Sequence, residues 1–270
     1  EDSEVSAALK KSLTKHGIKF HTATKTAAAE TTDSGVRLTL EPAAGGDQTT
    51  VEAEVCLVAV GVAPVLPKNA EQLKLSDRGY IETDERYQTN IPNVYAAGDI
   101  IGPPWLAHVA SYEAVQAVEG MFDPDFKPKK VTVFPGCTYC HPEVASVGLT
   151  EDACKEKGLD YRVGKFPFAA LGRAMALGKA DGFVKVVALG DRLVGAGVVG
   201  PEASELIAEL TLALEMGSSL EDLALTVHAH PTLSEAVHEA AEHALGQAVH
   251  IMNPRPARTS AAKAASATVR

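Results

Sequence analysis

Eight residues, His-Ala-His-Pro-Thr-Leu-Ser-Glu at positions 228–235, constrain this chain more than any other segment. Pro231 can hold a sharp bend, and the Thr and Ser that follow it are residue types that start helices. If a helix begins near Thr232, Glu235 lies in its first turn and His230 lies just outside it. The carboxylate could then bind one imidazole nitrogen and leave the other to take a proton, as a general base requires.

The same octet also has a purely structural interpretation. Glu235 can be the acidic residue of a capping box at an ordinary helix start, with His230 an ordinary surface histidine. Both interpretations stay open on these eight residues alone. His228, the other histidine of the octet, is more typical of a packing or interface residue.

A second candidate site lies at Gly98 and Asp99. Residues 94–97, Val-Tyr-Ala-Ala, are expected to form a short buried strand that ends in this Gly-Asp pair. The glycine would let a ligand approach the backbone, and the Asp99 carboxylate could accept hydrogen bonds from ligand hydroxyl groups. The alternative is an aspartate that serves only a turn.

Three segments resemble the flavin disulfide reductases, the pyridine nucleotide-disulfide oxidoreductases. The octet resembles their C-terminal signature, residues 89–99 their second flavin motif, and residues 140–148 the start of their interface domain. Within that family, the residues just before His230 and the closing stretch at 246–251 are most similar to the dihydrolipoyl dehydrogenases. Agreement between separate segments of one chain makes coincidence a poor explanation.

The resemblance implies roles for individual residues. His230 would be the acid/base and Glu235 its partner, and the His230–Pro231 peptide is expected to be cis, as about one X-Pro bond in twenty is. Asp99, next to Gly98, would hold the ribityl chain of FAD. The backbone of three further residues would approach the flavin ring: Leu106, Ala107 and His108.

Gly61 resembles the residue that closes the NAD-binding domain of the family. The family usually continues with an Arg-x-Pro-Asn run, whereas this chain has Val-Ala-Pro-Val at 62–65. A buried strand that simply leaves its sheet is therefore an equal interpretation at Gly61.

The activity that the resemblance implies is oxidation of protein-bound dihydrolipoamide, with electrons passing through a disulfide and FAD to NAD. The implied partners are a second copy of the chain and the lipoyl domains of 2-oxoacid dehydrogenase complexes. The redox disulfide and both glycine-rich loops of the family are absent from these 270 residues. We therefore expect a C-terminal portion that is inactive alone and binds FAD poorly. A glutathione reductase-like or other disulfide reductase is one alternative, and a non-catalytic dimerisation module is another.

The residue pattern predicts a mixed α/β and α+β chain. Residues 1–62 are expected to be the end of a Rossmann-like NAD domain, 63–128 a central FAD-contacting domain, 129–251 an α+β interface (dimerisation) domain with an antiparallel sheet, and 252–270 a disordered tail. The expected helices are 4–16, 107–122, 203–216, 219–225 and 232–245. The expected strands are 18–24, 36–40, 51–60, 94–97, 131–134, 144–147, 161–167, 183–189 and 193–199.

Two literal motif matches are expected to be misleading. Residues 195–200 read Gly-x-Gly-x-x-Gly, but they lie on the return arm of an antiparallel hairpin, where the glycines would serve packing under the following helix.

Residues 137–141, Cys-Thr-Tyr-Cys-His, match the spacing of haem attachment and part of a zinc site. Cysteines without chemistry are favoured there, with a Cys137–Cys140 redox pair as the remaining alternative, and no metal is expected. No cluster is recognisable among His108, His141, His238, His243 and His250.

Charge and cysteine usage exclude some classes of function. The net charge of −10 argues against nucleic acid as a partner. No apolar run approaches the length of a membrane span, so no membrane partner is expected. The cysteines do not suggest a secreted disulfide framework, and a reducing, cytoplasmic compartment fits best.

Overall fold

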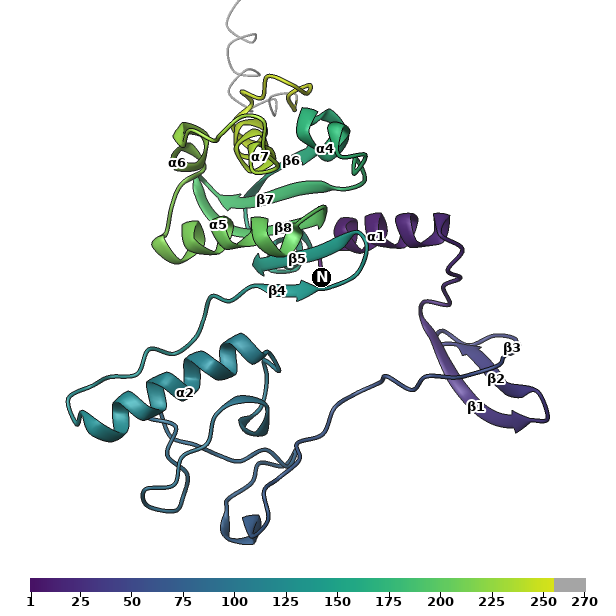
Figure 1. Ribbon diagram of the computed structural model, residues 1–270, viewed down its shortest axis with the longest axis vertical. Coiled ribbons are helices and arrows are strands. Elements are labelled where there is room, and N and C mark those ends of the chain that lie inside the picture. The colour runs from purple at the N-terminus through teal and green to yellow at the C-terminus, as the bar shows by residue number, and fades with distance from the viewer. Residues whose placement is uncertain (255–270) are drawn as a thin grey trace, which may run out of the picture. The chain divides into compact units, whose positions relative to one another are not determined.

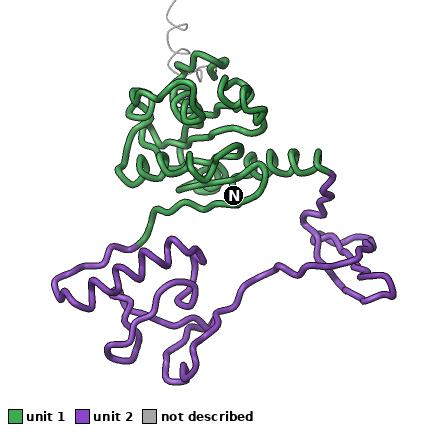
Figure 2. The backbone as a smooth tube through the Cα atoms, viewed as in Figure 1, with its two compact units in different colours: residues 1–16, 131–270 green, residues 17–130 purple. Residues whose placement is uncertain are grey.

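The computed structural model describes residues 1–254, which form two compact units (Figure 2). Unit 1 contains residues 1–16 and 131–254, and unit 2 contains residues 17–130. The expected disordered tail at 252–270 lies outside the described residues from position 255 onward.

Unit 1 is built on a five-stranded sheet (Figure 1). Its strands lie in the order β4-β5-β8-β7-β6, and every neighbouring pair is antiparallel. The turn at Gly190 and Asp191 joins β7 to β8, as the sequence predicts. The strands are β4 (Gly136–Thr138), β5 (Glu143–Gly148), β6 (Tyr161–Pro167), β7 (Phe183–Leu189) and β8 (Arg192–Gly200).

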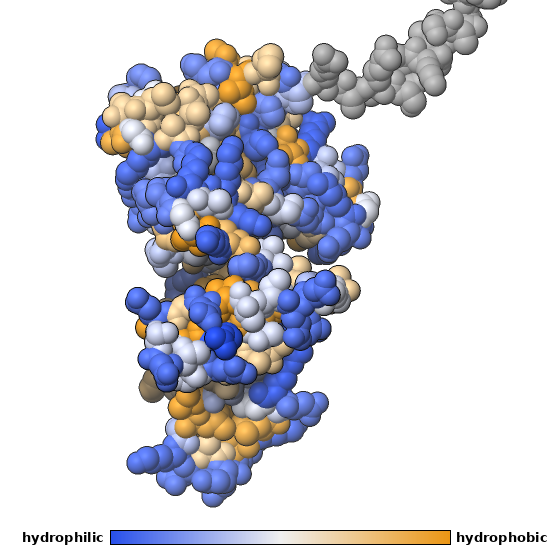
Figure 3. Space-filling model, turned by 90° about the vertical axis from the view of Figure 1, so that its right-hand side faces the viewer, coloured by the Kyte–Doolittle hydropathy of each residue, from blue (hydrophilic) through white to orange (hydrophobic). Residues whose placement is uncertain are grey.

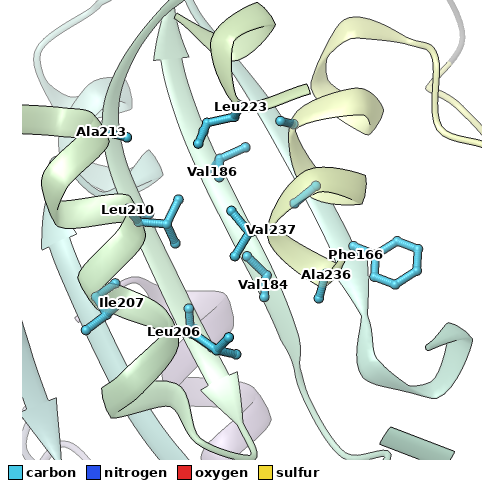
Figure 4. Packing of buried hydrophobic residues seen from close by; sticks show 14 of the residues in the cluster. Phe166, Val184, Val186, Leu206, Ile207, Leu210, Ala213, Leu223, Ala236 and Val237 are labelled. Carbon is cyan, nitrogen blue, oxygen red and sulfur yellow. The ribbon is translucent and has the colours of Figure 1, made fainter. Parts of the chain in front are cut away.

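The main core lies between this sheet and the C-terminal helices (Figure 4). Side chains alternate between the faces of a strand, so Val184 and Val186 of β7 point together into this core. Leu210 and Val237 meet them from two different helices. The helices of unit 1 other than the N-terminal one are α3 (Glu151–Glu156), α4 (Gly172–Ala176), α5 (Ala203–Met216), α6 (Leu220–Leu225) and α7 (Glu235–Leu245), and η3 is a 3-10 turn (Phe168–Ala170).

Helix α1 (Ser3–Lys15) packs on the other face of the sheet. Its first turn is capped by the Asp2 side chain, and Val5 is fully buried against Val144 and Val199. The sequence groups this helix with the strands that follow it, in residues 1–62. In the structure α1 instead belongs to unit 1, because its apolar stripe is buried on that sheet.

A buried lysine joins α1 to the sheet. Lys185 of β7 points to the α1 face and is only 2% exposed. Its ammonium Nζ lies 3.0 Å from the Asp2 carboxylate, 2.8 Å from Glu4 and 2.6 Å from Glu151. Burial would raise the pKa of Glu151, but hydrogen bonds from Lys155 and Lys185 outweigh it and lower that pKa to about 2.

Unit 2 combines a small antiparallel sheet, in the order β1-β2-β3, with one long helix. The C-terminal end of that helix, α2, is closed by Arg86, whose guanidinium donates to four backbone carbonyls, those of Gly120, Asp123, Pro124 and Phe126. The elements of unit 2 are β1 (Thr24–Thr32), β2 (Gly35–Pro42), β3 (Thr49–Ala53), η1 (Ala70–Gln72), η2 (Gly98–Ile101) and α2 (Ala107–Phe122).

Four predicted strands are wrong in whole or in part. Residues 18–23 and 131–134 are irregular, and residues 94–97 make only an isolated bridge from Tyr95 to Gln88. The strand predicted over 51–60 ends at Ala53, since the residues after it have no strand to pair with. Apolar side chains after Ala53 are therefore left exposed. Figure 3 shows apolar residues, in orange, on one face of the protein surface. Six large apolar side chains between residues 55 and 65 are more than half exposed: Val55, Leu57, Val58, Val60, Val62 and Val65.

The glycine-rich segment at 195–200 lies in β8, which pairs antiparallel with both β5 and β7. It is therefore part of a hairpin, as predicted. The packing partners differ from the prediction: a Cβ at Gly195 would overlap the backbone of Leu149, and one at Gly197 would lie 3.2 Å from Val5 of α1. These glycines permit close packing on Leu149 and α1 instead of on the following helix α5.

Candidate acid–base site

The octet forms the connection from α6 to α7. Its backbone bends at a cis His230–Pro231 peptide, which confirms the expectation from the sequence. The Thr232 hydroxyl donates to the carbonyl of Ala229 and closes the bend. Helix α7 begins at Glu235, three residues later than predicted, so the glutamate is the first residue of the helix.

His230 and Glu235 are joined directly. His230 Nδ1 lies 2.8 Å from Glu235 Oε1, while Glu235 Oε2 accepts the backbone N–H of Thr232 at 2.8 Å. The carboxylate thus orients the imidazole and accepts the backbone N–H of Thr232. The capping-box interpretation of Glu235 is wrong, because Glu235 is the first residue of α7 and the N-cap residue, Ser234, makes no side-chain hydrogen bond to the helix start. The His230 side chain is 79% exposed, and its Nε2 makes no hydrogen bond within the described residues. That nitrogen can exchange a proton with a ligand or with solvent.

The electrostatics favour an ionised Glu235. Partial burial pushes the pKa of this carboxyl up, but hydrogen bonds from His230 and from the Thr232 N–H outweigh it and hold the pKa below its ordinary value. A carboxylate in this state accepts the Nδ1–H of His230 and fixes the tautomer in which Nε2 is the basic nitrogen.

His228 has both ring nitrogens occupied. Its Nδ1 contacts the carbonyl of Thr226 at 2.9 Å, and its Nε2 lies 2.7 Å from Glu209 of α5. The Glu209 carboxylate raises the pKa of His228 above its ordinary value. His228 therefore ties the octet to α5, in line with the packing role expected from the sequence.

A cavity of about 360 Å³ lies beside His230 and Glu235. Its wall also contains three residues that the sequence did not single out as a group: His238, Glu239 and His250. One signal for Glu239 was available, since residues four apart share a helix face and Glu235 starts this helix. His250 carries no such signal because its position depends on how the chain returns after Gly246.

The second candidate site lies in unit 2, at the 3-10 turn η2. Gly98 has a φ of +78°, and a Cβ there would lie 2.9 Å from the Cβ of Ala110 in α2. The close approach of this helix explains the glycine without any ligand. The N–H of Gly98 donates to Glu113 at 2.9 Å. The Asp99 carboxylate is exposed and accepts no hydrogen bond from the described residues.

None of the other residues of the predicted cofactor set lines the cavity at Asp99. Leu106 is the residue before α2, and Ala107 and His108 are its first two residues. A cavity of about 230 Å³ is lined by Asp99, by Tyr80 and Trp105, and by the chain that follows Gly61, residues 62–65. Gly61 itself has a φ of +71° and is open around its Cα. An exposed carboxylate beside a cavity suits a ligand that carries hydroxyl groups.

The cysteine segment shows no activated thiol. Cys137 and Cys140 are both free, and burial raises the pKa of each thiol above its ordinary value. A raised pKa lowers the fraction of thiolate, the reactive form. Within residues 1–254, no group of three or more His, Cys, Asp or Glu side chains is placed to hold a metal ion. No helix in that range is long and apolar enough to cross a membrane.

Two family models match the sequence. The model described as pyridine nucleotide-disulphide oxidoreductase covers residues 1–114, and the model of the dimerisation domain of the same enzymes covers residues 134–241. The chain is 46% identical over 261 residues to the dihydrolipoyl dehydrogenase of Thermus scotoductus, with 93% of this chain and 55% of that protein covered. It is 45% identical over 251 residues to the leghemoglobin reductase of Glycine max, with 89% and 47% covered.

Solved structures show the same fold. The crystal structure of LpdA from Mycobacterium tuberculosis matches with a TM-score of 0.76 and 26% identity, over 90% of this chain and 53% of that chain. The flavoprotein disulfide reductase RclA from Escherichia coli matches with a TM-score of 0.80 at 20% identity, over 90% and 56% of the two chains. The chain spans about half the length of the curated relatives it matches. It is homologous to the dihydrolipoyl dehydrogenases and belongs to the pyridine nucleotide-disulphide oxidoreductase family.

Proposed function

We propose that this chain carries the acid–base part of a flavin-dependent disulfide oxidoreductase that oxidises protein-bound dihydrolipoamide, with NAD as the final acceptor. The observation that carries the proposal is the 2.8 Å contact between His230 Nδ1 and Glu235 Oε1, beside an exposed Nε2. The 46% identity to a dihydrolipoyl dehydrogenase supports the choice of substrate.

In this mechanism, Nε2 of His230 takes the proton of a substrate thiol. The resulting thiolate attacks one sulfur of a disulfide, forms a mixed disulfide and releases the second sulfur as a thiolate. Glu235 stabilises the imidazolium that His230 becomes, because its carboxylate already holds Nδ1. The attacked disulfide belongs to a part of the enzyme outside these 270 residues.

The cofactors would be held by unit 2. Asp99, next to Gly98, would accept hydrogen bonds from FAD hydroxyl groups. The backbone of three residues would approach the flavin ring: Leu106, Ala107 and His108. Gly61 would lie where the NAD-binding domain ends. The open carboxylate of Asp99 and the cavity beside it fit this assignment. FAD, when bound, accepts the two electrons of the dithiol and passes them on to NAD.

The partners would be a second copy of the chain and the lipoyl domains of 2-oxoacid dehydrogenase complexes. Residues 129–251 would form the homodimer interface, since most of this range matches the dimerisation model. Of residues 1–62, those after α1 would complete the NAD-binding domain, because α1 itself packs in unit 1. Residues 63–128 would form the FAD-contacting domain. The cytoplasmic location stays a prediction from cysteine usage.

Joining the chain to the N-terminal half of the Thermus scotoductus enzyme tests this function. The chimera is expected to reduce NAD with dihydrolipoamide and to reject glutathione. A chimera that binds FAD, forms dimers and turns over neither thiol would favour the non-catalytic dimerisation module. Turnover of glutathione alone would favour the glutathione reductase-like alternative.

A further inference from the structure

A second histidine and carboxylate meet on the same cavity. Glu239 lies one helical turn after Glu235 on α7, and its Oε1 is hydrogen-bonded to Nδ1 of His250. Glu239 is 5% exposed, whereas the His250 side chain is 65% exposed. The second oxygen of Glu239 is buried and has no partner within the described residues. A buried carboxylate in this state needs a nearby positive charge.

His250 reaches Glu239 because the chain turns back after α7. Gly246 ends the helix with a φ of +77°, and the next residue, Gln247, donates its N–H to the carbonyl of Glu242. Asn253 then holds Ala248 through two hydrogen bonds, of 2.7 and 3.0 Å. The return segment, residues 246–254, is thereby fixed against α7 with His250 facing the cavity.

The charges around this cavity come in pairs. Helix α7 supplies Glu235, Glu239 and Glu242, and His238 lies 3.4 Å from Glu242. The octet supplies His230, bonded to Glu235, and His228, bonded to Glu209 of α5. The lining residues from β6, η3, α4 and the residue between the last two carry no ionisable group: Phe166, Ala170, Leu171 and Gly172.

Two carboxylates four residues apart on a helix repel each other when both are ionised. Ionised Glu239 alone would therefore disfavour the charged form of Glu235. A proton on His250 opposes this effect, because the cation is hydrogen-bonded to Glu239 and also attracts Glu235. The pKa of His250 is raised by its hydrogen bond to Glu239, so the cation persists to higher pH than for an ordinary histidine.

We propose that His250 and Glu239 form a second histidine–carboxylate pair that positions Glu235, by holding it ionised in the orientation that binds His230. His250 is a positioning residue and touches no substrate. The inference rests on the proposed acid–base role of His230 and Glu235. It assigns a task to two residues that line the cavity, one on α7 and one on the return segment, and that the acid–base mechanism does not use.

The test is a carbon-13 NMR titration of the Glu235 carboxyl in the 270-residue chain. His250→Gln keeps a side-chain hydrogen-bond donor and removes the charge, so the pKa of Glu235 should rise. His250→Lys restores a cation and should return that pKa toward the wild-type value. Glu239→Gln removes the repelling carboxylate and should lower the pKa of Glu235 below the wild-type value. The control is His16→Gln, which changes an exposed histidine just after the end of α1 and should leave the pKa of Glu235 unchanged.

The opposite signs for His250→Gln and Glu239→Gln separate a charge effect from a loss of structure, which would move both variants the same way. An unchanged Glu235 pKa in His250→Gln, or no recovery in His250→Lys, overturns the proposal. Because the titration needs no turnover, it is independent of the proposed function. If the activity test of His230 fails, the titration result for Glu235 still stands. If the titration fails, the proposed function of His230 is not affected.

Discussion

At the scale of single residues, the site depends on Glu235 serving two partners at once. One carboxylate oxygen holds His230, and the other holds the N–H of Thr232. Placing the carboxylate at the first residue of α7 keeps both partners within reach. Because Glu235 is the first residue of α7, the orientation of the His230 ring depends on where α7 begins. It also depends on how closely α7 packs on the sheet.

Gly164 of β6 controls that packing. A Cβ at this position would overlap the carbonyl oxygen of Ala240 in α7. We expect Gly164→Ala to destabilise unit 1 by about 1–3 kcal/mol, as overpacking of a core does, and to weaken the His230–Glu235 bond. Thermal unfolding measures the first effect and the tautomer of His230 by nitrogen-15 NMR the second. Gly172→Ala is the matched control, because no atom lies within 4 Å of its Cβ position. Equal melting temperatures for the two variants would contradict this account.

The sequence predicted the residues of the site that are near neighbours along the chain. His230 and Glu235 are five positions apart, and the bend between them is marked by Pro231. His250 and Glu239 were not predicted as a pair because eleven residues separate them. Their contact depends on the return of the chain at Gly246, which no local pattern of residue types specifies.

At the scale of elements, Lys185 and its three carboxylates hold α1 on the sheet. Removing one member of a buried ion pair leaves the other charges without compensation. We expect Lys185→Met to destabilise unit 1 by about 3–5 kcal/mol, the usual range for such a loss. Denaturant unfolding of the wild type and the variant measures the difference. Lys179→Met, which removes an exposed ion pair with Glu202, is the control and should have little effect. A stable Lys185→Met protein would show that this cluster is dispensable.

The same cluster makes unit 1 sensitive to acid. The pKa of Glu151 in the folded chain is about 2, below its ordinary value of 4.5. A lowered pKa contributes stability that is complete above the ordinary value and is lost as the pH falls from about 4.5 toward 2. Glu151→Gln should therefore flatten the fall of stability with pH in this window. Parallel curves for wild type and variant would exclude Glu151 as the cause.

Helices and strands with a regular apolar period and a packing partner in the same unit were predicted with the correct bounds. The bounds of β6, β7, α2 and α5 agree with the predicted ranges, because each has a regular apolar period and finds a partner within its own unit. The predicted strand over 51–60 is apolar except at Glu52 and Glu54, but hydrogen-bonded pairing stops at Ala53. Apolar composition alone does not make a strand, since the backbone also needs a neighbour.

At the scale of the whole molecule, unit 1 has its own sheet, its own core and the residues that match a dimerisation domain. We expect the 270-residue chain to form a dimer and to retain less than stoichiometric FAD, because it supplies only part of the proposed flavin site. Size-exclusion chromatography with light scattering, read at 280 and 450 nm with added FAD, measures both properties. A monomer would contradict the proposed interface, and full flavin retention would contradict the proposed division of the cofactor site.

The most direct test of the central claim separates the two half-reactions of the chimera. If His230 accepts the proton of the dithiol, His230→Gln should slow flavin reduction by dihydrolipoamide by about 10²–10⁴-fold, the usual contribution of a general base. Flavin reduction by NADH should keep its wild-type rate, because no substrate thiol is deprotonated in that half-reaction. Stopped-flow absorbance at 450 nm measures both rates. Near-normal reduction by dihydrolipoamide in His230→Gln, with FAD bound, would contradict the acid–base role of His230.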